Sequence, residues 1–364
     1  MRILCLITDA FGSYGGISKF NRDLLTALCS CSTVEEVVAI PRIMPNSPGV
    51  LPKKLTHVTE ALNRKARFIT TTLRIAARNR DFDLIICGHI NLLPLSCVCR
   101  WLTGRPLALV VHGVDAWKPT RSLLANHLVG KVDALISVSE YTRNRIREWA
   151  KLGKVNCYIL PNCVNLESFG PGPKNEGLLD RYGLKGKTVL MTLGRLDSQE
   201  RAKGFDEVLE VLPHIARDIP DIVYLIAGDG PDRARLAEKA RTLKIEDRVV
   251  FAGFVREEEK ADHYRLADAY VMPSRGEGFG IVFLEAMACG IPVIGSRADA
   301  GREALRDGKL GALVNPADNK EILKAVKNAL KAQRRIPEGL AYFSEEAFQV
   351  RVQEMLTVVT GTRN

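Results

Sequence analysis

The run from Ser274 to Glu285 places two carboxylates, Glu277 and Glu285, eight positions apart around a glycine-rich loop. Gly278 and Gly280 would let the loop backbone approach a ligand closely, because they lack a side chain. We expect a helix to begin after this loop, with its unpaired N–H groups and positive dipole end suited to a phosphate. Glu285 would lie about one turn inside that helix, where an acceptor-only carboxylate suits a pair of sugar hydroxyls. The run therefore indicates a nucleotide-sugar held by its diphosphate, ribose and sugar ring.

Taken alone, this pattern has a simpler interpretation. A glutamate on a helix usually faces solvent, and Gly-x-Gly loops are common in proteins of every class. The functional interpretation depends on which other residues reach the same place.

Two cations form a second candidate group. The segment Val189–Leu193 has the apolar and β-branched residues of a buried strand, and Arg195 follows its end. Lys203 precedes a helix expected from about Asp206 to Ile219, and Arg201 is a rival to Lys203. A guanidinium can bind a diphosphate bidentately, whereas an ammonium acts as a point charge. A strand, a loop with two cations and a helix are typical of a phosphate site.

Three more segments of the second half read as buried strands, at 223–227, 249–252 and 269–272. Because the carboxyl ends of parallel strands form the ligand-binding edge of an open α/β sheet, the loops that follow them should meet there. The loop Gly253-Phe254-Val255 is a candidate part of that edge. Asp229 more simply suits capping of a helix that begins near Pro231.

The first half alternates strands and helices in the same way, with strands expected at 2–7, 36–40, 83–87, 107–111, 134–138 and 157–160. Its candidates are Gly15-Gly16, which precedes a helix, and His112, which follows a strand. A glycine pair before a helix is mostly turn chemistry, and a histidine at a strand end is more often a structural hydrogen-bonding group.

Taken together, these motifs resemble the retaining glycosyltransferases of family 4. In the second half the resemblance rests on Gly194-Arg195-Leu196 with Lys203-Gly204, Gly228-Asp229-Gly230-Pro231, the run from Glu277 to Glu285, and Ala288-Cys289-Gly290-Ile291-Pro292-Val293-Ile294. In the first half it rests on His112-Gly113, Ser137-Val138-Ser139 and Pro161-Asn162-Cys163-Val164-Asn165, where the family often has Gly and Asp in place of Cys163 and Asn165. It spans nearly the whole chain, from Gly15-Gly16 to about Asp318.

The resemblance implies an α/β protein of the GT-B fold, with two Rossmann-like domains whose parallel sheets face an interdomain cleft. We expect an N-terminal acceptor domain over residues 1–167 and a C-terminal nucleotide-sugar domain over residues 168–344. A final helix, in residues 345–364, would return to the N-terminal domain. Chain length supports two domains, since 364 residues are enough for two cores of ordinary size.

The resemblance also assigns roles to the candidates. Arg195 and Lys203 would clamp the diphosphate, and Glu285 would bind the ribose. His112 and Glu277 would contact the donor sugar, and these two with the two cations form the expected catalytic set. Further donor contacts would come from three segments: Gly15-Gly16, Gly253-Phe254-Val255 and Gly278-Phe279-Gly280-Ile281.

The expected reaction is transfer of a hexose, of mannose or of glucose or galactose type, from a GDP- or UDP-sugar with retention at the anomeric carbon. No Asp-x-Asp motif ends a strand, so we expect the two cations to neutralise the diphosphate without a metal, and we expect no cofactor. The nine cysteines include no Cys-x-x-Cys pair and fit buried free thiols. The open alternatives are a GT-B sugar phosphorylase, a nucleotide-sugar epimerase, a non-catalytic sugar-nucleotide binding protein and a basic membrane-surface scaffold.

Positive charge is concentrated in the first half. The net charge is +10, with 23 Lys and Arg against 14 Asp and Glu in residues 1–180, and 29 against 28 in residues 181–364. Residues 53–80 alone hold eight of the cations against one glutamate. An apolar stripe at helical spacing would consist of Val58, Leu62, Ile69, Leu73 and Ala76.

Arg67, Arg74 and Arg78 fall opposite this stripe, and Arg64 and Lys65 add to the positive charge. A basic amphipathic helix suits an anionic membrane surface, although a solvated helix packed on the sheet is equally compatible. The stretch lacks interleaved aromatic residues, which argues against nucleic acid as a partner.

The chain contains no run of about 18 apolar residues, and its first strand does not read as a signal peptide. We therefore expect a cytoplasmic protein, peripheral on the inner face of the cytoplasmic membrane. Its acceptor would be a glycan or a lipid-linked molecule, in surface polysaccharide or glycolipid assembly.

Overall fold

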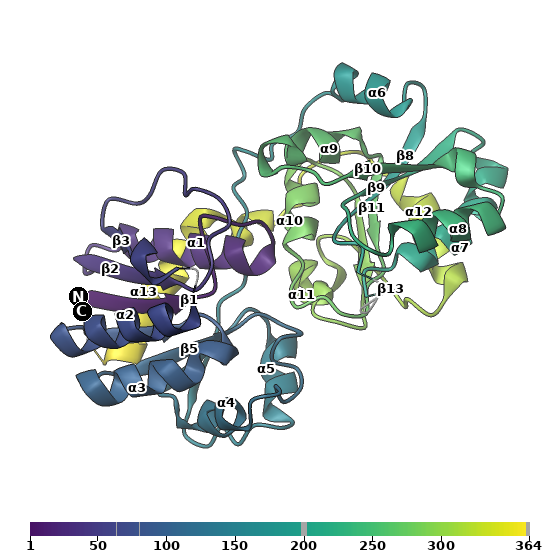
Figure 1. Cartoon of the computed structure of the whole chain (residues 1–364). Helices are drawn as coiled ribbons and strands as arrows, with labels where there is room; N and C mark the ends of the chain where they lie inside the picture. Colours follow the sequence, from purple (N-terminus) through teal and green to yellow (C-terminus); the bar gives the residue numbers. More distant parts are fainter. Residues whose placement is uncertain (63, 80, 198–201, 362–364) are drawn as a thin grey trace. The chain divides into compact units, whose positions relative to one another are not determined.

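The computed structural model describes residues 1–62, 64–79, 81–197 and 202–361, so Arg201 lies outside the described residues. Figure 1 shows its helices and strands. The chain forms two compact units, of which unit 1 comprises Met1–Cys163 with Glu345–Asn364 and unit 2 comprises Val164–Ser344. Each unit is an α/β structure built on one parallel sheet.

The sheet of unit 1 has the strand order β3-β2-β1-β4-β5-β6-β7. Its strands are β1 Arg2–Ile7, β2 Glu36–Pro41, β3 Leu55–His57, β4 Leu84–Cys87, β5 Leu107–Val111, β6 Ala134–Ser137 and β7 Asn156–Ile159. The central strands β4 and β5 are apolar and buried along their whole length because a parallel sheet is covered by helices on both faces. The edge strand β3, of only three residues, was not predicted from the sequence.

Among the residues that the structure describes, unit 1 contains the α-helices α1 Gly16–Ser30, α2 Lys65–Arg78, α3 Leu93–Thr103, α4 Leu123–Leu128, α5 Glu140–Arg147 and α13 Glu345–Thr360. The last of them packs against α1, where the rings of Phe20 and Phe348 meet edge to face at 5.9 Å. This contact joins the last part of the chain to the first helix.

The predicted basic helix is only partly correct. Val58 and Leu62 lie outside α2, because β3 and a short 3-10 turn at Thr59–Ala61 occupy that stretch. The buried face of α2 is formed by Phe68, Thr71, Thr72 and Ala76, whereas Ile69 and Leu73 are only half-buried. Buried threonines thus replace part of the expected apolar stripe.

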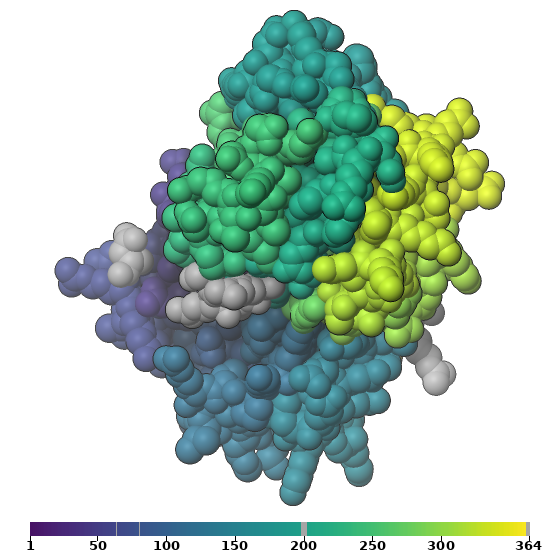
Figure 2. All heavy atoms as spheres, turned by 90° about the vertical axis from the view of Figure 1, so that its right-hand side faces the viewer, coloured from purple at the N-terminus to yellow at the C-terminus, as the bar shows by residue number. Residues whose placement is uncertain are grey.

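The sheet of unit 2 has the strand order β10-β9-β8-β11-β12-β13. Its strands are β8 Thr188–Leu193, β9 Ile222–Ala227, β10 Val249–Gly253, β11 Ala269–Met272, β12 Val293–Ser296 and β13 Ala312–Val314. Its helices are α6 Glu176–Tyr182, α7 Phe205–Asp218, α8 Arg233–Thr242, α9 Lys260–Leu266, α10 Ile281–Ala288, α11 Gly301–Ala304 and α12 Asn319–Ala329. Figure 2 views the side of unit 2 that carries α7, α8 and α12. Helix α7 packs against both α8 and α12, and the three helices form a common apolar core with the sheet.

None of the helices that the structure describes is long and apolar enough to cross a membrane.

Candidate functional site

Two loops at the carboxyl edge of the sheet in unit 2 are joined by a close backbone contact and a backbone hydrogen bond. The described part of the first loop comprises residues 194–197 and 202–204, between β8 and α7, and the second loop follows β11 and runs to Gly280. Gly204 has φ +78°, and a Cβ added to it would lie 2.6 Å from the carbonyl oxygen of Pro273. The backbone N–H of Arg275 donates a 2.7 Å hydrogen bond to the carbonyl of Ala202. This close approach is possible because Gly204 has no side chain.

The charged residues predicted on these two loops meet directly. Lys203 Nζ lies 2.5 Å from Glu277 Oε2, and the two side chains are 28% and 14% exposed. Arg195 is 77% exposed, and its Nε lies 3.8 Å from the Asp197 carboxylate. Unit 2 therefore brings a largely buried ion pair and an exposed guanidinium to the same edge of its sheet.

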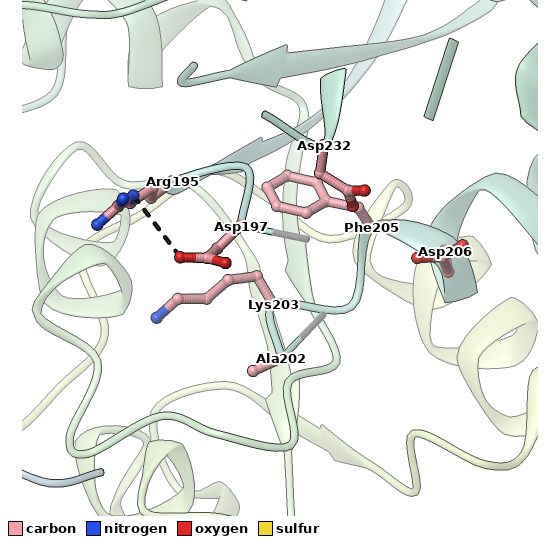
Figure 3. Close-up of a pocket in the computed structure, with 7 residues that line it drawn as sticks. All are labelled: Arg195, Asp197, Ala202, Lys203, Phe205, Asp206 and Asp232. Carbon is pink, nitrogen blue, oxygen red and sulfur yellow. Dashed lines mark ion pairs between the residues drawn. The ribbon is translucent and has the colours of Figure 1, made fainter. Parts of the chain in front are cut away.

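A cavity of about 130 Å³ lies beside these cations. Its lining includes Arg195, Lys203 and Phe205 together with the carboxylates of Asp197 and Asp206. In Figure 3 the nitrogen atoms of Arg195 and Lys203 point to the same side of the cavity, while Asp206 lies on the other side, beyond Phe205. Two cations that point to one side suit the oxygens of a diphosphate.

Asp206, which also lines the cavity, has two cationic partners of its own. Arg235 donates two 2.7 Å hydrogen bonds to its carboxylate, and Lys239 donates a third at 2.8 Å. Burial alone would raise the pKa of Asp206, but these hydrogen bonds outweigh burial and lower the pKa to about 2. The positive charge that faces the cavity therefore comes from Arg195 and Lys203.

The Glu277 loop is anchored by a residue that sequence analysis missed. Asp299 Oδ2 accepts a 2.9 Å hydrogen bond from the N–H of Glu277, and Oδ1 accepts one of 3.0 Å from Gly301. The N–H of Ala300 donates to the carbonyl of Glu277 at 3.1 Å. Asp299 is fully buried, and burial raises its pKa to about 6 against the effect of these hydrogen bonds. Asp299 follows β12, whose carboxyl end lies at the same sheet edge, and this position in the sequence could have identified it as a candidate.

The start of α10 depends on Gly280. Its φ is +98°, and a Cβ there would lie 2.4 Å from the ring of Phe283. Phe279 is 2% exposed, and its ring packs against Phe343 at 5.6 Å. The side chain of Phe279 therefore belongs to the core, and this residue can face a ligand only through its backbone.

Glu285 is fully buried and is not part of the cavity lining. Its carboxylate accepts hydrogen bonds from Tyr264 Oη at 2.8 Å and from Lys260 Nζ at 3.2 Å. Burial by itself would lower the pKa of Lys260, but the carboxylates of Glu285 and Glu257 outweigh it and raise that pKa above its ordinary value. Neither partner was predicted from the sequence, and Lys260, which follows three glutamates, resembles a surface residue.

The predicted donor-contacting segment Gly253-Phe254-Val255 lies at the end of β10. Gly253 has φ +75°, Phe254 is 57% exposed and Val255 is buried. The segment leads into the turn Glu257–Glu259, where Glu257 pairs with Lys260 at 3.0 Å. Lys260 thus connects this segment with Glu285.

In unit 1, His112 follows β5 and its ring is half-buried. Its Nε2 lies 2.9 Å from the carbonyl oxygen of Gly88. Since a carbonyl oxygen only accepts, Nε2 carries a proton in this arrangement, and Nδ1 is buried without a hydrogen-bond partner among the described residues. Gly15 precedes α1 with φ +114°, and both Gly15 and Gly16 are exposed.

The remaining predicted residues are the basic ones at α2. Arg64, Lys65, Arg67, Arg74 and Arg78 are all exposed, on α2 or directly before it. Over the part of the chain that the structure describes, no group of three His, Cys, Asp or Glu side chains could hold a metal ion.

The predicted capping role of Asp229 is wrong. Asp232 occupies the position before α8 and makes no side-chain cap, while the Asp229 side chain bonds the N–H of Gly230.

The sequence matches two protein-family models. Residues 180–350 match "Glycosyl transferases group 1", and residues 14–168 match "Glycosyltransferase Family 4". The chain is 34% identical over 346 residues to a phosphatidyl-myo-inositol mannosyltransferase of Mycobacterium leprae, an alignment that covers 91% of this chain and 88% of that protein.

A second relative is a GDP-mannose-dependent alpha-(1-6)-phosphatidylinositol monomannoside mannosyltransferase of Mycolicibacterium smegmatis. It is 32% identical over 252 residues, which cover 66% of this chain and 65% of the relative. This alignment thus spans just under two thirds of the relative's length.

Among solved structures, Anabaena HepE in complex with UDP-glucose superposes with a TM-score of 0.78 at 19% identity, over 98% of this chain and all of that one. The lipopolysaccharide outer core galactosyltransferase WaaB superposes with a TM-score of 0.73 at 18% identity, over 98% and 99% of the two chains. At these identities the likeness establishes the fold, which is the GT-B fold of two α/β units.

Proposed function

The chain belongs to glycosyltransferase family 4, and from this premise we propose that it transfers a hexose from a nucleotide-diphosphate sugar to a lipid-linked acceptor. GDP-mannose is the donor we favour, because the chain is 32% identical to a GDP-mannose-dependent mannosyltransferase. The acceptor class follows from the same relatives, whose names specify phosphatidylinositol glycolipids. The proposed role is therefore glycolipid or surface polysaccharide assembly.

One observation carries the proposal most directly: Lys203 meets Glu277 at 2.5 Å beside a cavity that Arg195 also lines. A diphosphate needs cations, and a sugar needs a hydroxyl-binding carboxylate next to them. These loops supply both groups. Because negative charge develops on the departing diphosphate, preorganised cations at this point would stabilise the transition state.

We further propose that the donor binds without a metal. Arg195 and Lys203 would neutralise the diphosphate, with the N-terminus of α10 supplying partial positive charge. The test is calorimetric binding of UDP, GDP, ADP and their sugar conjugates in EDTA, followed by addition of Mg²⁺. Binding of GDP or UDP in EDTA is the expected result, whereas binding that appears only with Mg²⁺ would contradict metal-free clamping.

The same titration distinguishes the alternatives. Failure of every nucleotide to bind in either condition would reject the donor site and favour a sugar phosphorylase. Binding of a nucleotide-sugar that is converted to a different sugar nucleotide without an acceptor would indicate an epimerase. Release of the nucleoside diphosphate only when an acceptor is added supports the transferase.

For the chemistry we propose a front-face displacement with retention. The bond from the anomeric carbon to the phosphate oxygen breaks, the bond to the acceptor oxygen forms on the same face, and the acceptor proton moves to the leaving phosphate. Glu277 is ill suited to act as a nucleophile because Lys203 binds its carboxylate. An NMR spectrum of the product should show the anomeric configuration of the donor, and a trapped covalent glycosyl-enzyme would disprove the mechanism.

We also propose that unit 1 docks on an anionic membrane surface through α2 and α3, which pack against each other. The exposed arginines of α2 supply positive charge, and α3 exposes Val98 and, at 79%, Trp101. A tryptophan beside basic residues suits the bilayer interface, where its ring is apolar and its N–H is polar.

Tryptophan fluorescence with vesicles tests this docking. Anionic vesicles should shift the emission of the native chain to the blue, and Trp101→Phe should remove most of that shift. The other two tryptophans, Trp117 and Trp149, are half-buried and serve as an internal reference. An equal shift in the variant, or no shift in either chain, would count against docking through α3.

A further inference from the structure

The two central strands of unit 2, β8 and β11, separate before their carboxyl ends. Within the described residues, the last pair between them is Tyr270 with Met191. On its other side β8 stays paired with β9 as far as Leu193, and β11 stays paired with β12 to its own end. The sheet therefore opens between β8 and β11. The loops that carry Arg195 and Glu277 begin on the two sides of this opening, which is where open α/β sheets bind ligands.

The hydroxyl of Tyr270 continues the pairing where the two strands separate. It accepts a 3.3 Å hydrogen bond from the N–H of Leu193 and donates one of 3.2 Å to the carbonyl of the same residue. It also lies 3.6 Å from Met272 Sδ. One hydroxyl can serve both backbone groups because it is a donor and an acceptor. The N–H and C=O of Leu193 are thus satisfied although β11 no longer pairs with β8 at this level.

Leu193 lies two positions before Arg195, and the residue between them is held from the opposite side. The N–H of Gly194 donates a 2.9 Å hydrogen bond to the carbonyl of Ala227 in β9. Because the Arg195 side chain is 77% exposed, its position depends mainly on the backbone that carries it. Without the Tyr270 hydroxyl, the end of β8 would lose these two hydrogen bonds on its β11 side, and Arg195 would be placed less precisely.

The ring of Tyr270 contacts two residues that support other parts of the candidate site. It meets Phe283 edge to face at 6.0 Å, and the Phe283 ring lies against Gly280 at the start of α10. It also meets the ring of Tyr264 at 5.7 Å, and the Tyr264 hydroxyl donates to Glu285. Tyr270 itself is fully buried and does not line the cavity. It can therefore affect a bound ligand only through its neighbours.

We propose that Tyr270 is a positioning residue, whose hydroxyl holds the end of β8 so that Arg195 meets the donor diphosphate. This inference rests on the proposed function and assigns a role to a residue that does not touch the donor. The ring contributes packing that a phenylalanine would also provide, whereas the two hydrogen bonds to Leu193 require the hydroxyl. The positioning role can therefore be separated from a general contribution to the core.

Tyr270→Phe in the full chain is the test, because it removes the hydroxyl and keeps the ring. Calorimetry in EDTA measures the affinity for GDP and UDP. We expect the variant to bind the preferred nucleotide about fivefold to tenfold more weakly than the native chain, since a misplaced guanidinium makes weaker charge-assisted hydrogen bonds to the diphosphate.

Combining Tyr270→Phe with Arg195→Ala identifies the residue through which the hydroxyl acts. If the hydroxyl acts by placing Arg195, its removal should change the affinity less than about twofold once the guanidinium is gone. A contribution to fold stability alone would leave the affinity unchanged or lower it equally in both backgrounds.

Tyr224→Phe is the matched control. Tyr224 is also fully buried in the sheet of unit 2, on β9, but its hydroxyl donates at 2.7 Å to a side chain, Thr192 Oγ1. This variant should bind nucleotide as the native chain does. Hydrogen exchange followed by mass spectrometry tests the structural step: the N–H of Leu193 should exchange faster in Tyr270→Phe than in Tyr224→Phe or the native chain. Thermal melting identifies a temperature at which all three are folded.

The role of Tyr270 would be overturned by an unchanged affinity in Tyr270→Phe, by an equal loss in the Arg195→Ala background or in Tyr224→Phe, or by unchanged exchange at Leu193. These outcomes differ from a failure of the proposed function. If the native chain binds a nucleotide and Tyr270→Phe binds it equally well, the donor site stands and this inference fails. If the native chain binds neither nucleotide, the proposed donor site fails, and the role of Tyr270 fails with it.

Discussion

Lys203 and Glu277, 74 residues apart in the sequence, meet at 2.5 Å between two loops of unit 2. The pairing means that the cation proposed for the diphosphate and the carboxylate proposed for the donor sugar are one electrostatic unit. Each side chain holds the other in place before any ligand arrives. A change in either residue should therefore affect both functions.

Lys203→Ala should lower the turnover number by about 10²-fold or more, because it removes a preorganised charge from the leaving diphosphate. Arg195→Ala should have an effect of similar size. The measurement is the steady-state rate of transfer. Lys239→Ala, which removes an ammonium bound to Asp206 and Glu210 instead, is the control and should keep most of the activity.

A double-mutant cycle tests the coupling between Lys203 and Glu277. Glu277→Gln alone should impair transfer, and combining it with Lys203→Ala should cost less than the sum of the two single effects. Strictly additive effects would show that the two groups act independently, despite their contact in the structure.

Glu285→Gln should weaken nucleotide binding by about 1.5–3 kcal/mol if its carboxylate binds the ribose, since charge-assisted hydrogen bonds have this strength. It should also destabilise the fold, because it weakens the pairing of Lys260, whose side chain is only 16% exposed. Calorimetry and thermal melting measure the two effects separately.

Adding Lys260→Met to Glu285→Gln separates the effect on nucleotide binding from the effect on fold stability. The double variant lacks the Lys260 ammonium, so no positive charge is left without its Glu285 partner, and we expect its stability to recover. It should still bind nucleotide weakly. Recovery of binding together with stability would assign Glu285 a purely structural role.

Acid should impair donor binding through Asp299, whose pKa is about 6. Protonation places a hydrogen on a carboxyl oxygen that otherwise accepts from the N–H of Glu277 or Gly301, so one anchor of the loop is lost. Nucleotide affinity measured by titration should fall as the pH drops through about 6. Asp299→Asn should bind weakly at every pH and lack this transition, and an unchanged transition in that variant would assign it to another group.

The same proton equilibrium has a consequence for stability. The folded-state pKa of Asp299 lies above the ordinary value of 3.8, so the folded chain binds more protons between about pH 4 and 6. The contribution of Asp299 to the free energy of unfolding should therefore decrease as the pH rises through that range. Chemical denaturation across this range should show a shallower decline in Asp299→Asn than in the native chain.

Replacing Arg67, Arg74 and Arg78 together by Gln should weaken binding to anionic vesicles about a hundredfold, at roughly 1 kcal/mol per arginine near the surface. Vesicle sedimentation measures the effect. Replacement of three exposed arginines of unit 2 is the matched control: Arg181, Arg217 and Arg241. Equal losses in both triple variants would indicate a general charge effect rather than docking through α2.

The strands were the most predictable part of the fold. A segment such as β8, Thr188–Leu193, is apolar and β-branched because helices cover both faces of a parallel sheet. The edge strand β3 lacks this signature, since Leu55, Thr56 and His57 are half-buried or exposed. The register of α2 was misjudged because Thr71 and Thr72, polar by type, are buried in the core.

The residues of the candidate site could be predicted from the sequence, but the contacts between them could not. The loops after β8 and β11 could be placed at one sheet edge because strand ends in parallel sheets share an edge. The pairing of Lys203 with Glu277 depends on the path of both loops, and the anchoring by Asp299 depends on burial. Neither leaves a periodic signal in the sequence. The burial of Glu285 was missed because a glutamate on a helix normally faces water.

The helix α13 makes unit 1 discontinuous, since residues of unit 2 are inserted between Cys163 and Glu345. The chain leaves and re-enters unit 1 at adjacent points, where Val164 pairs with Ser344. During synthesis unit 2 can fold as soon as it emerges from the ribosome, whereas α1 must wait for α13 to cover Phe20. Nascent unit 1 therefore exposes an apolar helix face throughout the translation of its neighbour, and this interval is when chaperones should be needed most.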